Sequence, residues 1–584
     1  MPKNVMKMLK PSPTLGRNDF DLSHRTVHTA NFGELIPNMC VETVPGDKIK
    51  VRISDLVRAE PMVTSPFLRA KQHVDVWFVP YNLMWSRFNE FIADKDEPAS
   101  SALHDRLFVP QCTIADLVSA YADYATSSLV DIHYQSCGRR VARNLDLLGL
   151  PGTWIRQANK DSYSWTGNSH SYNVVNLWRL AAYNLIWYRE YRQQYYDTGA
   201  YNLPSAIASS ALGPSYLFNF DWLQCDTAAN ANIETNMSGL LAAMLQPRFR
   251  CWKKDLFTGL MPSTQFGNVS VVESPVSYAA STSHSNAVLS INSSNRLVRS
   301  TNATGGSAPT QYDLEYVYSN ANVDILSLRK SEAIQKWREN ALRAGNQIED
   351  NFEAHYGVKP KSHLNVHPQF VASFDAPLNI GDINSQAQTG TGENQYLGDV
   401  AGKGIMSFDG SSEFTFETND FGVLMGIYSI LPEAEYNANG IDRLNCLLER
   451  QDYFYPEYEN LGLEAVAKND FTINYSVDNV IGYAPRYYAY KQKIDRCCGE
   501  MMRYTPFYPS APDFNGQFRQ WCSPKYDVDD VSGSTLPLSV LYVNPFIYDV
   551  NFVNSVSLND QFIVDFFADV QAIRHMTVSG MPSY

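Results

Sequence analysis

The stretch Ala70-Lys-Gln-His-Val-Asp-Val-Trp-Phe-Val-Pro80 decides the fold class of this chain. Its apolar side chains Val74, Val76 and Phe78 recur at every second position, which is the period of a β-strand and not of a helix. Pro80 ends the run because proline lacks the backbone N–H that a strand ladder needs. The stretch therefore predicts a β-strand with an apolar face.

Similar signals continue on both sides of this strand. Residues 421–431 (FGVLMGIYSIL) are almost continuously apolar, which is typical of a strand buried on both faces. Phe414-Thr-Phe416 alternates, and Val44-Pro-Gly-Asp47 is a turn signal, since proline presets φ and glycine permits a positive φ. The 30 prolines and 32 glycines lie between short apolar runs, so we expect a mainly β chain, a β-sandwich with long connections.

Three segments with helical spacing interrupt the predicted strands: 113–126, 176–196 and 322–346. They lie far apart in the sequence. We therefore expect these helices on loops of a β core and not packed together as a bundle.

Composition excludes several classes of protein. The 584 residues are 44% apolar, 13% aromatic and only 18% charged, and a disordered chain lacks such aromatic content. The net charge of −14 excludes a uniformly basic nucleic-acid-binding surface. No apolar run approaches the roughly 18–20 residues of a membrane helix, so we expect no membrane insertion.

The N-terminus and the cysteines indicate where the chain is made. Residues 1–24 lack the apolar region of a secretory signal. The nine cysteines are odd in number and form no CxxC motif. Reduced thiols and synthesis in a cytosol are therefore expected.

Residues 1–30 form a basic segment on an otherwise acidic chain. Five basic residues against two acidic ones give this segment a charge of +3, which leaves −17 for the remainder. Its prolines and Gly16 break regular structure, so we predict an extended arm. Either the arm is a frayed terminus or it contacts an acidic partner, of which nucleic acid is the obvious one.

Residues 271–310 differ in composition from the rest. Ser, Thr, Asn and Gly supply 20 of these 40 residues, and only three are charged. Two short apolar runs, 288–291 and 297–298, flank Asn292-Ser-Ser-Asn295 and predict a small exposed hairpin. Such a long insertion costs little loop entropy, and it is either a neutral spacer or a projection that contacts a partner.

Catalytic motifs are largely missing from the sequence. It contains no GxSxG or HExxH motif, and the glycines from Gly398 to Gly404 do not have the spacing of a phosphate loop. His363 and His367 are four residues apart, but nearby prolines argue against the helix that a metal site would need. We expect no catalytic residues, no metal and no cofactor. Abundant Tyr, Trp and Phe instead favour an assembly protein, because interfaces are rich in aromatic side chains.

A series of short motifs then carries a family resemblance. The motifs, in chain order, are Phe20-Asp-Leu-Ser-His24, Gly33-Glu-Leu-Ile-Pro37, Val76-Trp-Phe-Val-Pro80, Trp252-Lys-Lys-Asp-Leu-Phe-Thr-Gly259, Asp452-Tyr-Phe-Tyr-Pro-Glu457, Gly482-Tyr-Ala-Pro-Arg-Tyr487 and Gly580-Met-Pro582. Together they resemble the major capsid proteins of the Microviridae, and the gokushovirus-like branch in particular. The resemblance covers nearly the whole chain.

This resemblance implies an eight-stranded antiparallel viral jelly roll with long loop insertions that carry several helices. Residues 31–584 would form one capsid domain, with a variable surface loop at 268–320 inserted in it. The family builds a small icosahedral (T=1) bacteriophage shell around circular single-stranded DNA, together with a small basic DNA-binding protein and a minor, or pilot, protein. The virion capsid is the expected location, after assembly in the bacterial host cytoplasm.

Two sets of site residues follow from these expectations. We expect the arm to contact DNA phosphates through Lys3, Lys7, Lys10 and Arg17. We expect the variable loop to contact a host cell surface receptor through Asn292, Ser293, Ser294, Asn295 and Arg296.

One alternative stays open at the level of sequence. A jelly-roll protein that binds or cleaves carbohydrate would also use exposed aromatic side chains with paired carboxylates. The sequence offers Glu433 with Glu435, and Asp529 with Asp530. A concave site with two carboxylates at glycosidase separation would distinguish this alternative.

Overall fold

A computed structural model describes much of the chain. The described residues are 17–62, 69–92, 107–125, 132–160, 174–197, 213–223, 238–265, 287–291, 297–301, 325–344, 348–357, 367–384, 400–408, 413–437, 440–470, 480–499, 541–545, 548, 552, 560–576 and 578. The chain divides into two compact units. The first unit comprises Met1–Pro262 and Lys361–Tyr584, and the second comprises Ser263–Pro360.

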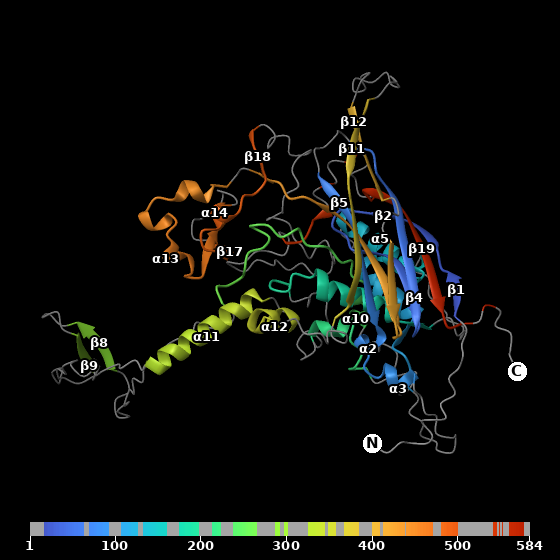
Figure 1. Cartoon of the computed structure of the whole chain (residues 1–584), viewed down its shortest axis with the longest axis horizontal. Coiled ribbons are helices and arrows are strands. Elements are labelled where there is room, and N and C mark those ends of the chain that lie inside the picture. The colour runs from blue at the N-terminus through green and yellow to red at the C-terminus, as the bar shows by residue number, and fades with distance from the viewer. Residues whose placement is uncertain are drawn as a thin grey trace, which may run out of the picture. The chain divides into compact units, whose positions relative to one another are not determined.

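Two antiparallel sheets form the centre of the first unit (Figure 1). Among the described residues, the larger sheet has seven strands in the order β1-β19-β4-β12-β11, with β2 also paired to β19 and β13 to β4. Its strands are β1 (Asn18–Asp21), β2 (His24–Ala30), β4 (Asp47–Ala59), β11 (Asn379–Asn384), β12 (Val400–Phe408), β13 (Glu413–Thr418) and β19 (Phe562–Arg574). The smaller sheet has the order β10-β5-β14-β3. Its strands are β3 (Ile36–Thr43), β5 (Ala70–Pro80), β10 (Gln369–Pro377) and β14 (Gly422–Pro432).

The two sheets enclose an apolar core. Side chains of β4 alternate between buried and exposed along almost its whole length, so this strand has one face inside and one outside. Val51 of β4, Phe566 of β19, and Leu424 and Tyr428 of β14 belong to one buried cluster. The molecule is therefore an antiparallel β-sandwich, and this part of the predicted fold class is confirmed.

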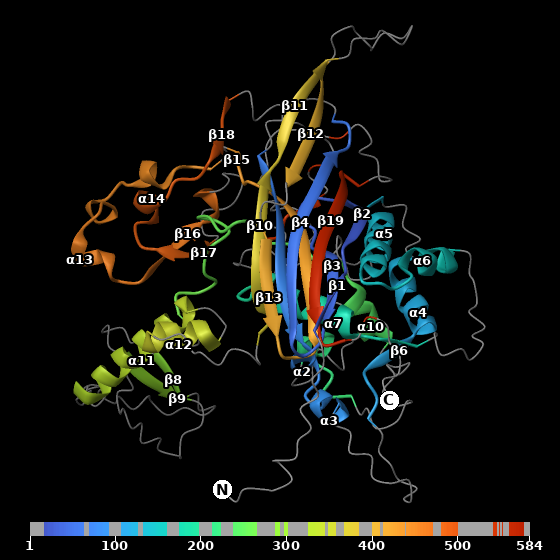
Figure 2. The same ribbon diagram turned by 45° about the vertical axis from the view of Figure 1, so that its right-hand side comes forward.

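A second core lies on the other face of the smaller sheet. There Val79, Val423 and Met425 share a buried cluster with Trp178 and Leu241, which come from helices. The helices of this layer are α4 (Ile114–Ala125), α5 (Ile132–Leu147), α6 (Gly152–Lys160), α7 (Trp178–Ile186) and α10 (Ser238–Leu245), several of which are grouped beside the strands in Figure 2. This second layer explains why β5 and β14 are buried on both faces.

Smaller elements complete the first unit. These are α2 (Tyr81–Met84), α3 (Phe88–Ile92), β6 (Gln111–Thr113), β7 (Val174–Asn176), the π-helical turn η2 (Trp187–Tyr191) and η3 (Gly213–Leu217). A segment after β14, which we call the lobe (residues 436–497), contains β15 (Tyr436–Asn437), η7 (Arg443–Cys446), η8 (Arg450–Asp452), α13 (Pro456–Glu459), β16 (Leu463–Ala467), η9 (Lys468–Asp470), β17 (Val480–Pro485), α14 (Tyr488–Lys491) and β18 (Arg496–Cys497).

The second unit contains a strand pair and two helices in its described residues. Strands β8 (Ala287–Ile291) and β9 (Leu297–Thr301) pair antiparallel, which confirms the predicted hairpin strands. Helices α11 (Ile325–Arg343) and α12 (Ile348–Tyr356) contact one another, and the rings of Trp337 and His355 stack with centroids 5.9 Å apart.

The predicted helices occur on connections between strands, as expected. However, α4 and α7, expected apart, instead share one buried cluster, and α7 and α11 are shorter than predicted. Helix α7 begins at Trp178 because residues 174–176 pair with β6 as a strand. It continues only to Tyr191 as a π-helical turn, where Arg192 N donates to Trp187 O. No helix in the described part of the chain combines the length and apolar composition needed to cross a membrane.

Candidate functional site

The sequence-predicted site residues are only partly described by the structure. Lys3, Lys7 and Lys10 lie outside the described residues, as do the hairpin-tip residues 292–296 between β8 and β9. Arg17 is described, and its Nε donates to Nε2 of His575 at 3.0 Å. Arg17 thus lies beside the end of β19, because the next residue, Asn18, begins β1 and pairs with Arg574 of β19. The predicted DNA and receptor contacts of these residues stay predictions.

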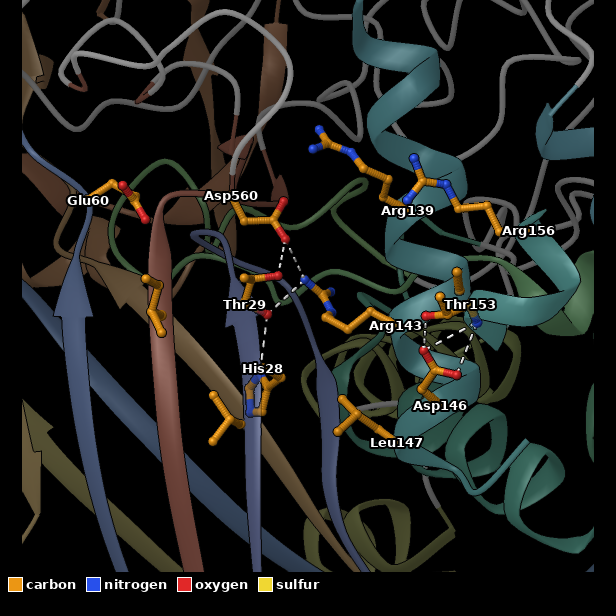
Figure 3. Close-up of a pocket in the computed structure, with 13 residues that line it drawn as sticks. His28, Thr29, Glu60, Arg139, Arg143, Asp146, Leu147, Thr153, Arg156 and Asp560 are labelled. Carbon is orange, nitrogen blue, oxygen red and sulfur yellow. Dashed lines mark hydrogen bonds and ion pairs between the residues drawn. The ribbon is translucent and has the colours of Figure 1, made fainter. Parts of the chain in front are cut away.

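A charged pocket of about 510 Å³ lies elsewhere in the first unit, and the sequence did not predict it. It is lined by residues of β2, α5 and α6 together with the start of β19 (Figure 3). Its charged side chains are Glu60, Arg139, Arg143, Asp146, Arg156 and Asp560.

Arg143 is the centre of a buried ionic network beside this pocket. Its Nη2 lies 2.9 Å from Oε2 of Glu34, and its Nη1 lies 3.4 Å from Oδ2 of Asp560. Nη1 also donates to the carbonyl oxygen of Thr29 at 2.9 Å. Arg140, one turn earlier on α5, forms a second ion pair with Glu34. Glu34 therefore faces two arginines although only 2% of its side chain is exposed.

Amide groups complete the coordination of the two carboxylates. Nδ2 of Asn31 donates to Glu34 at 3.1 Å and to Asp560 at 2.9 Å. The Thr29 hydroxyl donates to Asp560 as well. Asn31 in turn accepts a hydrogen bond from the backbone N–H of Gln561 at 3.0 Å. The network thus connects the β2–β3 turn, helix α5 and the entry to β19.

The ionic contacts change the acidity of these groups. Burial alone would raise the pKa of Asp560, but Arg143 and the Thr29 hydroxyl lower that pKa to about 2. For Arg143, burial alone would lower the pKa, but the charges of Glu34 and Asp560 raise it above its usual value. Both groups are therefore held in their charged forms across the ordinary pH range.

His28 lies on β2 beside the network and is held neutral. Burial lowers its pKa to about 4, although its hydrogen bond to the Thr29 carbonyl opposes this shift. Its ring packs edge-on against Tyr428 of the opposite sheet, with centroids 5.7 Å apart. His28 therefore belongs to the sandwich interior as much as to the pocket wall.

The junction between α5 and α6 places Arg156, on α6, at the pocket. Asp146 accepts a hydrogen bond from the backbone N–H of Thr153 at 3.0 Å, which satisfies a donor in the first turn of α6. A Cβ at Gly152 would lie 2.0 Å from the carbonyl oxygen of Ala142, so only glycine fits where the two helices meet.

The charged groups that line the pocket are three arginines and three carboxylates, so their formal charges balance. Asp560 is engaged by Arg143 and Asp146 by Thr153, whereas Arg139 and Arg156 lie near each other on α5 and α6 (Figure 3). Burial and the nearby charge of Arg156 lower the pKa of Arg139, while Asp560 raises it.

Other candidate chemical groups are also engaged in structural contacts. Glu433 and Glu435 both contact Arg69, at 3.4 Å and 2.9 Å. His367 is buried, and His363 lies outside the described residues. Within the described ranges, no three His, Cys, Asp or Glu side chains come together as a possible metal site.

The comparisons with known proteins place the chain in a family. It belongs to the capsid protein (F protein) family, whose match covers residues 10–134 and 149–584. The family resemblance seen in the sequence is therefore confirmed, and it is a family of structural capsid proteins.

Two relatives match over nearly their full lengths. The capsid protein VP1 of Chlamydia phage 1 is 22% identical over 610 residues, which cover 98% of this chain and 96% of the relative. The capsid protein VP1 of Bdellovibrio phage phiMH2K is 21% identical over 612 residues, with the same coverage. The stretch 135–148 lies outside the family match, and it contains Arg139, Arg140 and Arg143. Their partners Glu34 and Asp560 lie inside the matched ranges.

Proposed function

We propose that this chain is the major capsid protein of a small icosahedral (T=1) bacteriophage and that its copies assemble into the shell around circular single-stranded DNA. The observation that carries the proposal is the family match, which extends over almost the whole chain and not over one domain of it. Capsid function belongs to the whole fold, so a match of this extent supports it more strongly than a short motif would.

We further propose that the sandwich is a viral jelly roll. The pairing supports this: β2-β19-β4-β12 lie side by side in one sheet, and β3-β14-β5-β10 in the other. On this assignment β13 continues β12 along β4, and β1 and β11 are additions at the edges. Strands from both ends of the chain alternate between the two sheets, as two interlocked Greek keys require. Viral capsid domains are among the proteins that use this fold.

The flanking segments would supply the contacts of the shell with its surroundings. The expected arm, residues 1–30, would bind the genome through the part that precedes β1, with Lys3, Lys7, Lys10 and Arg17, alongside a small basic DNA-binding protein and a minor or pilot protein. The loop at 268–320, which falls in the second unit, would contact a host receptor near Asn292–Arg296. Assembly would take place in the bacterial cytoplasm. The jelly-roll domain, expected over residues 31–584, would also include β1 and β2 (residues 18–30), because both strands pair with β19.

The carbohydrate alternative gains little support from the described residues. A glycosidase needs one carboxyl group as acid and a second as nucleophile or base, separated by about 5–9.5 Å across the sugar. Glu433 and Glu435 instead share one arginine, Arg69. Asp529 and Asp530 lie outside the described residues.

Electron microscopy of the purified chain tests the proposal. We expect uniform closed particles, at most a few hundred ångström across, when the protein is brought to assembly conditions with single-stranded DNA. A protein that stays monomeric under every salt and pH condition, with or without DNA, would contradict the shell function.

A further inference from the structure

The lobe, whose helices α13 and α14 are labelled in Figure 1, carries a group of exposed aromatic side chains. We call it the aromatic face and define it by Tyr453, Phe454, Tyr455, Tyr458 and Tyr490. Each of these side chains is between 38% and 51% exposed. Leu448 and Leu461, nearby in the sequence, are 86% and 65% exposed. A monomeric surface rarely gathers so many apolar groups unless it binds something.

Buried Tyr487 orders these exposed rings. Phe454 meets it edge-on at 5.2 Å and Tyr490 at 6.4 Å, and its hydroxyl accepts a hydrogen bond from the backbone N–H of Tyr455 at 3.4 Å. Arg486 lies over the ring of Tyr458, 5.8 Å from its centroid. Tyr487 has a φ of 61°, the single positive φ of a residue other than glycine in the described chain. Strained backbone of this kind persists where surrounding contacts fix it, often at functional sites.

The charge of the lobe limits the class of partner. The lobe as a whole contains nine acidic and seven basic side chains, a net charge of −2, and its negative charge is concentrated in residues 440–464, which carry four of the five rings and a net charge of −4. Such a surface repels the phosphates of DNA, so base stacking on these rings is disfavoured. A basic protein surface with apolar groups of its own is the complementary partner.

Helix α11 of the second unit has these properties. It contains five basic and two acidic residues, a net charge of +3. Helical spacing places Leu326, Ala333 and Trp337 on one face, and Leu326 and Trp337 are 71% and 60% exposed. Exposed Lys330 and Lys336 flank that face.

We propose that α11 of one copy binds the aromatic face of a second copy in the shell. This inference rests on the proposed capsid function. The contact is heterologous, because it joins two different surfaces, and such contacts build closed shells when their rotation closes. Trp337 and Leu326 would pack among the exposed tyrosines, while Lys330 and Lys336 would face Glu449 and Glu457.

Charge reversal tests the contact directly. Glu457→Lys and Lys336→Glu should each reduce the yield of assembled particles at least about tenfold, because each places like charges together in a repeated interface. The combined variant should recover assembly to within about threefold of the wild type, since the pair is restored with its signs exchanged. Asp420→Lys is the matched control: it reverses one exposed acidic charge in the turn between β13 and β14, and we expect wild-type yield.

The readouts separate this inference from the function on which it rests. If the wild-type chain forms no particles, the capsid function fails. If the wild type assembles and both reversals assemble equally well, only the proposed contact is overturned. Thermal midpoints of the unassembled variants should equal that of the wild type, since both substituted side chains are exposed.

A second measurement covers the case of a variant that fails to fold. Tyr453→Cys and Trp337→Cys, placed on separate chains of distinguishable mass, should form a disulfide between chains in assembled particles that the wild-type chain, with its exposed native Cys498, does not form. Particles in which no such cross-link forms under oxidation would overturn the proposal. Binding of a glycan or an oligonucleotide that Tyr453→Ala abolishes, with assembly unchanged, would assign the face to another ligand and also overturn it.

Discussion

Arg143 shows how individual residues connect distant parts of this chain. Its side chain is 10% exposed and contacts Glu34 and Asp560, which are 109 and 417 positions away in the sequence. A buried ion pair of this kind stabilises a fold less than its Coulomb energy suggests, because both groups lose hydration. Removing one partner is costly all the same, since the other charges stay buried.

We therefore predict that Arg143→Met destabilises the subunit by about 3–5 kcal/mol. Urea unfolding of the unassembled protein measures this loss. Arg156→Met is the control, because Arg156 is exposed, and its effect should stay within about 0.5 kcal/mol. Equal unfolding midpoints for the two variants would show that the ionic network of Arg143 stabilises the fold no more than exposed Arg156 does.

His28 gives the subunit a dependence on pH. Its pKa is about 4 when folded and 6.5 when unperturbed, so between these values the unfolded chain binds a proton that the folded chain does not. Stability is therefore complete above pH 6.5 and decreases as the pH falls to 4, by about 3 kcal/mol for this residue.

The variant His28→Gln should reduce the slope of the free energy of unfolding against pH. Some dependence should persist, because burial also lowers the pKa of His73 to about 4. Urea unfolding at several pH values between 4 and 7 gives this slope for the wild type and for the variant. The two slopes are compared, and not the absolute stabilities. Identical slopes in the variant and the wild type would mean that His28 does not titrate in this way.

At the scale of elements, the meeting point of α5 and α6 depends on one glycine. A Cβ at Gly152 would lie 2.0 Å from the Ala142 carbonyl oxygen and 2.7 Å from Cβ of Leu145. We predict that Gly152→Ala forces the helices apart and costs about 1–3 kcal/mol. Thr153→Ala, which removes only the hydroxyl that contacts Asp146, should cost about 1 kcal/mol. Thermal unfolding of both variants checks the difference, and a stable Gly152→Ala would contradict the tight junction.

Local patterns predicted the elements whose burial follows a simple period. The strand 70–80 is β5 with the same ends, and 421–431 is β14 shifted by one residue. The turn Val44-Pro-Gly-Asp47 separates β3 from β4, with Gly46 at a φ of 88°. Helix 322–346 occurs as 325–343, and residues 322–324 and 345–346 lie outside the described residues.

Such local patterns could not predict contacts between segments that are distant in the sequence. The sequence Arg139-Arg140-Val-Ala-Arg143 signals a basic helical face, but nothing local indicates that Glu34 and Asp560 neutralise it. The same limit applies to the strand order, because β2 and β4 both pair with β19, which follows them by more than 500 residues. The pocket could not be predicted for this reason, since it forms only where these segments meet.

Over the whole molecule, charge is divided between an acidic body and a basic arm. On the proposed function, a chain with a net charge of −14 would hold a DNA genome through local positive segments, and residues 1–30 are one such segment at +3. Contacts of lysine and arginine with phosphates release bound cations, so their contribution is read from the dependence of binding on salt.

Deletion of residues 1–17 removes Lys3, Lys7, Lys10 and Arg17 together. We predict that the slope of log affinity for single-stranded DNA against log salt concentration falls by about 3, since each phosphate contact contributes about 0.7. Titration of a fluorescent oligonucleotide at several sodium chloride concentrations measures this slope. The control variant Lys48→Gln with Lys50→Gln also removes positive charge, but these lysines pair with Glu417 and Glu413 on the sheet, so the slope should hardly change. Equal slopes for the deletion and the wild type would exclude the arm from DNA binding and leave the genome to be held by the folded body or by other virion proteins.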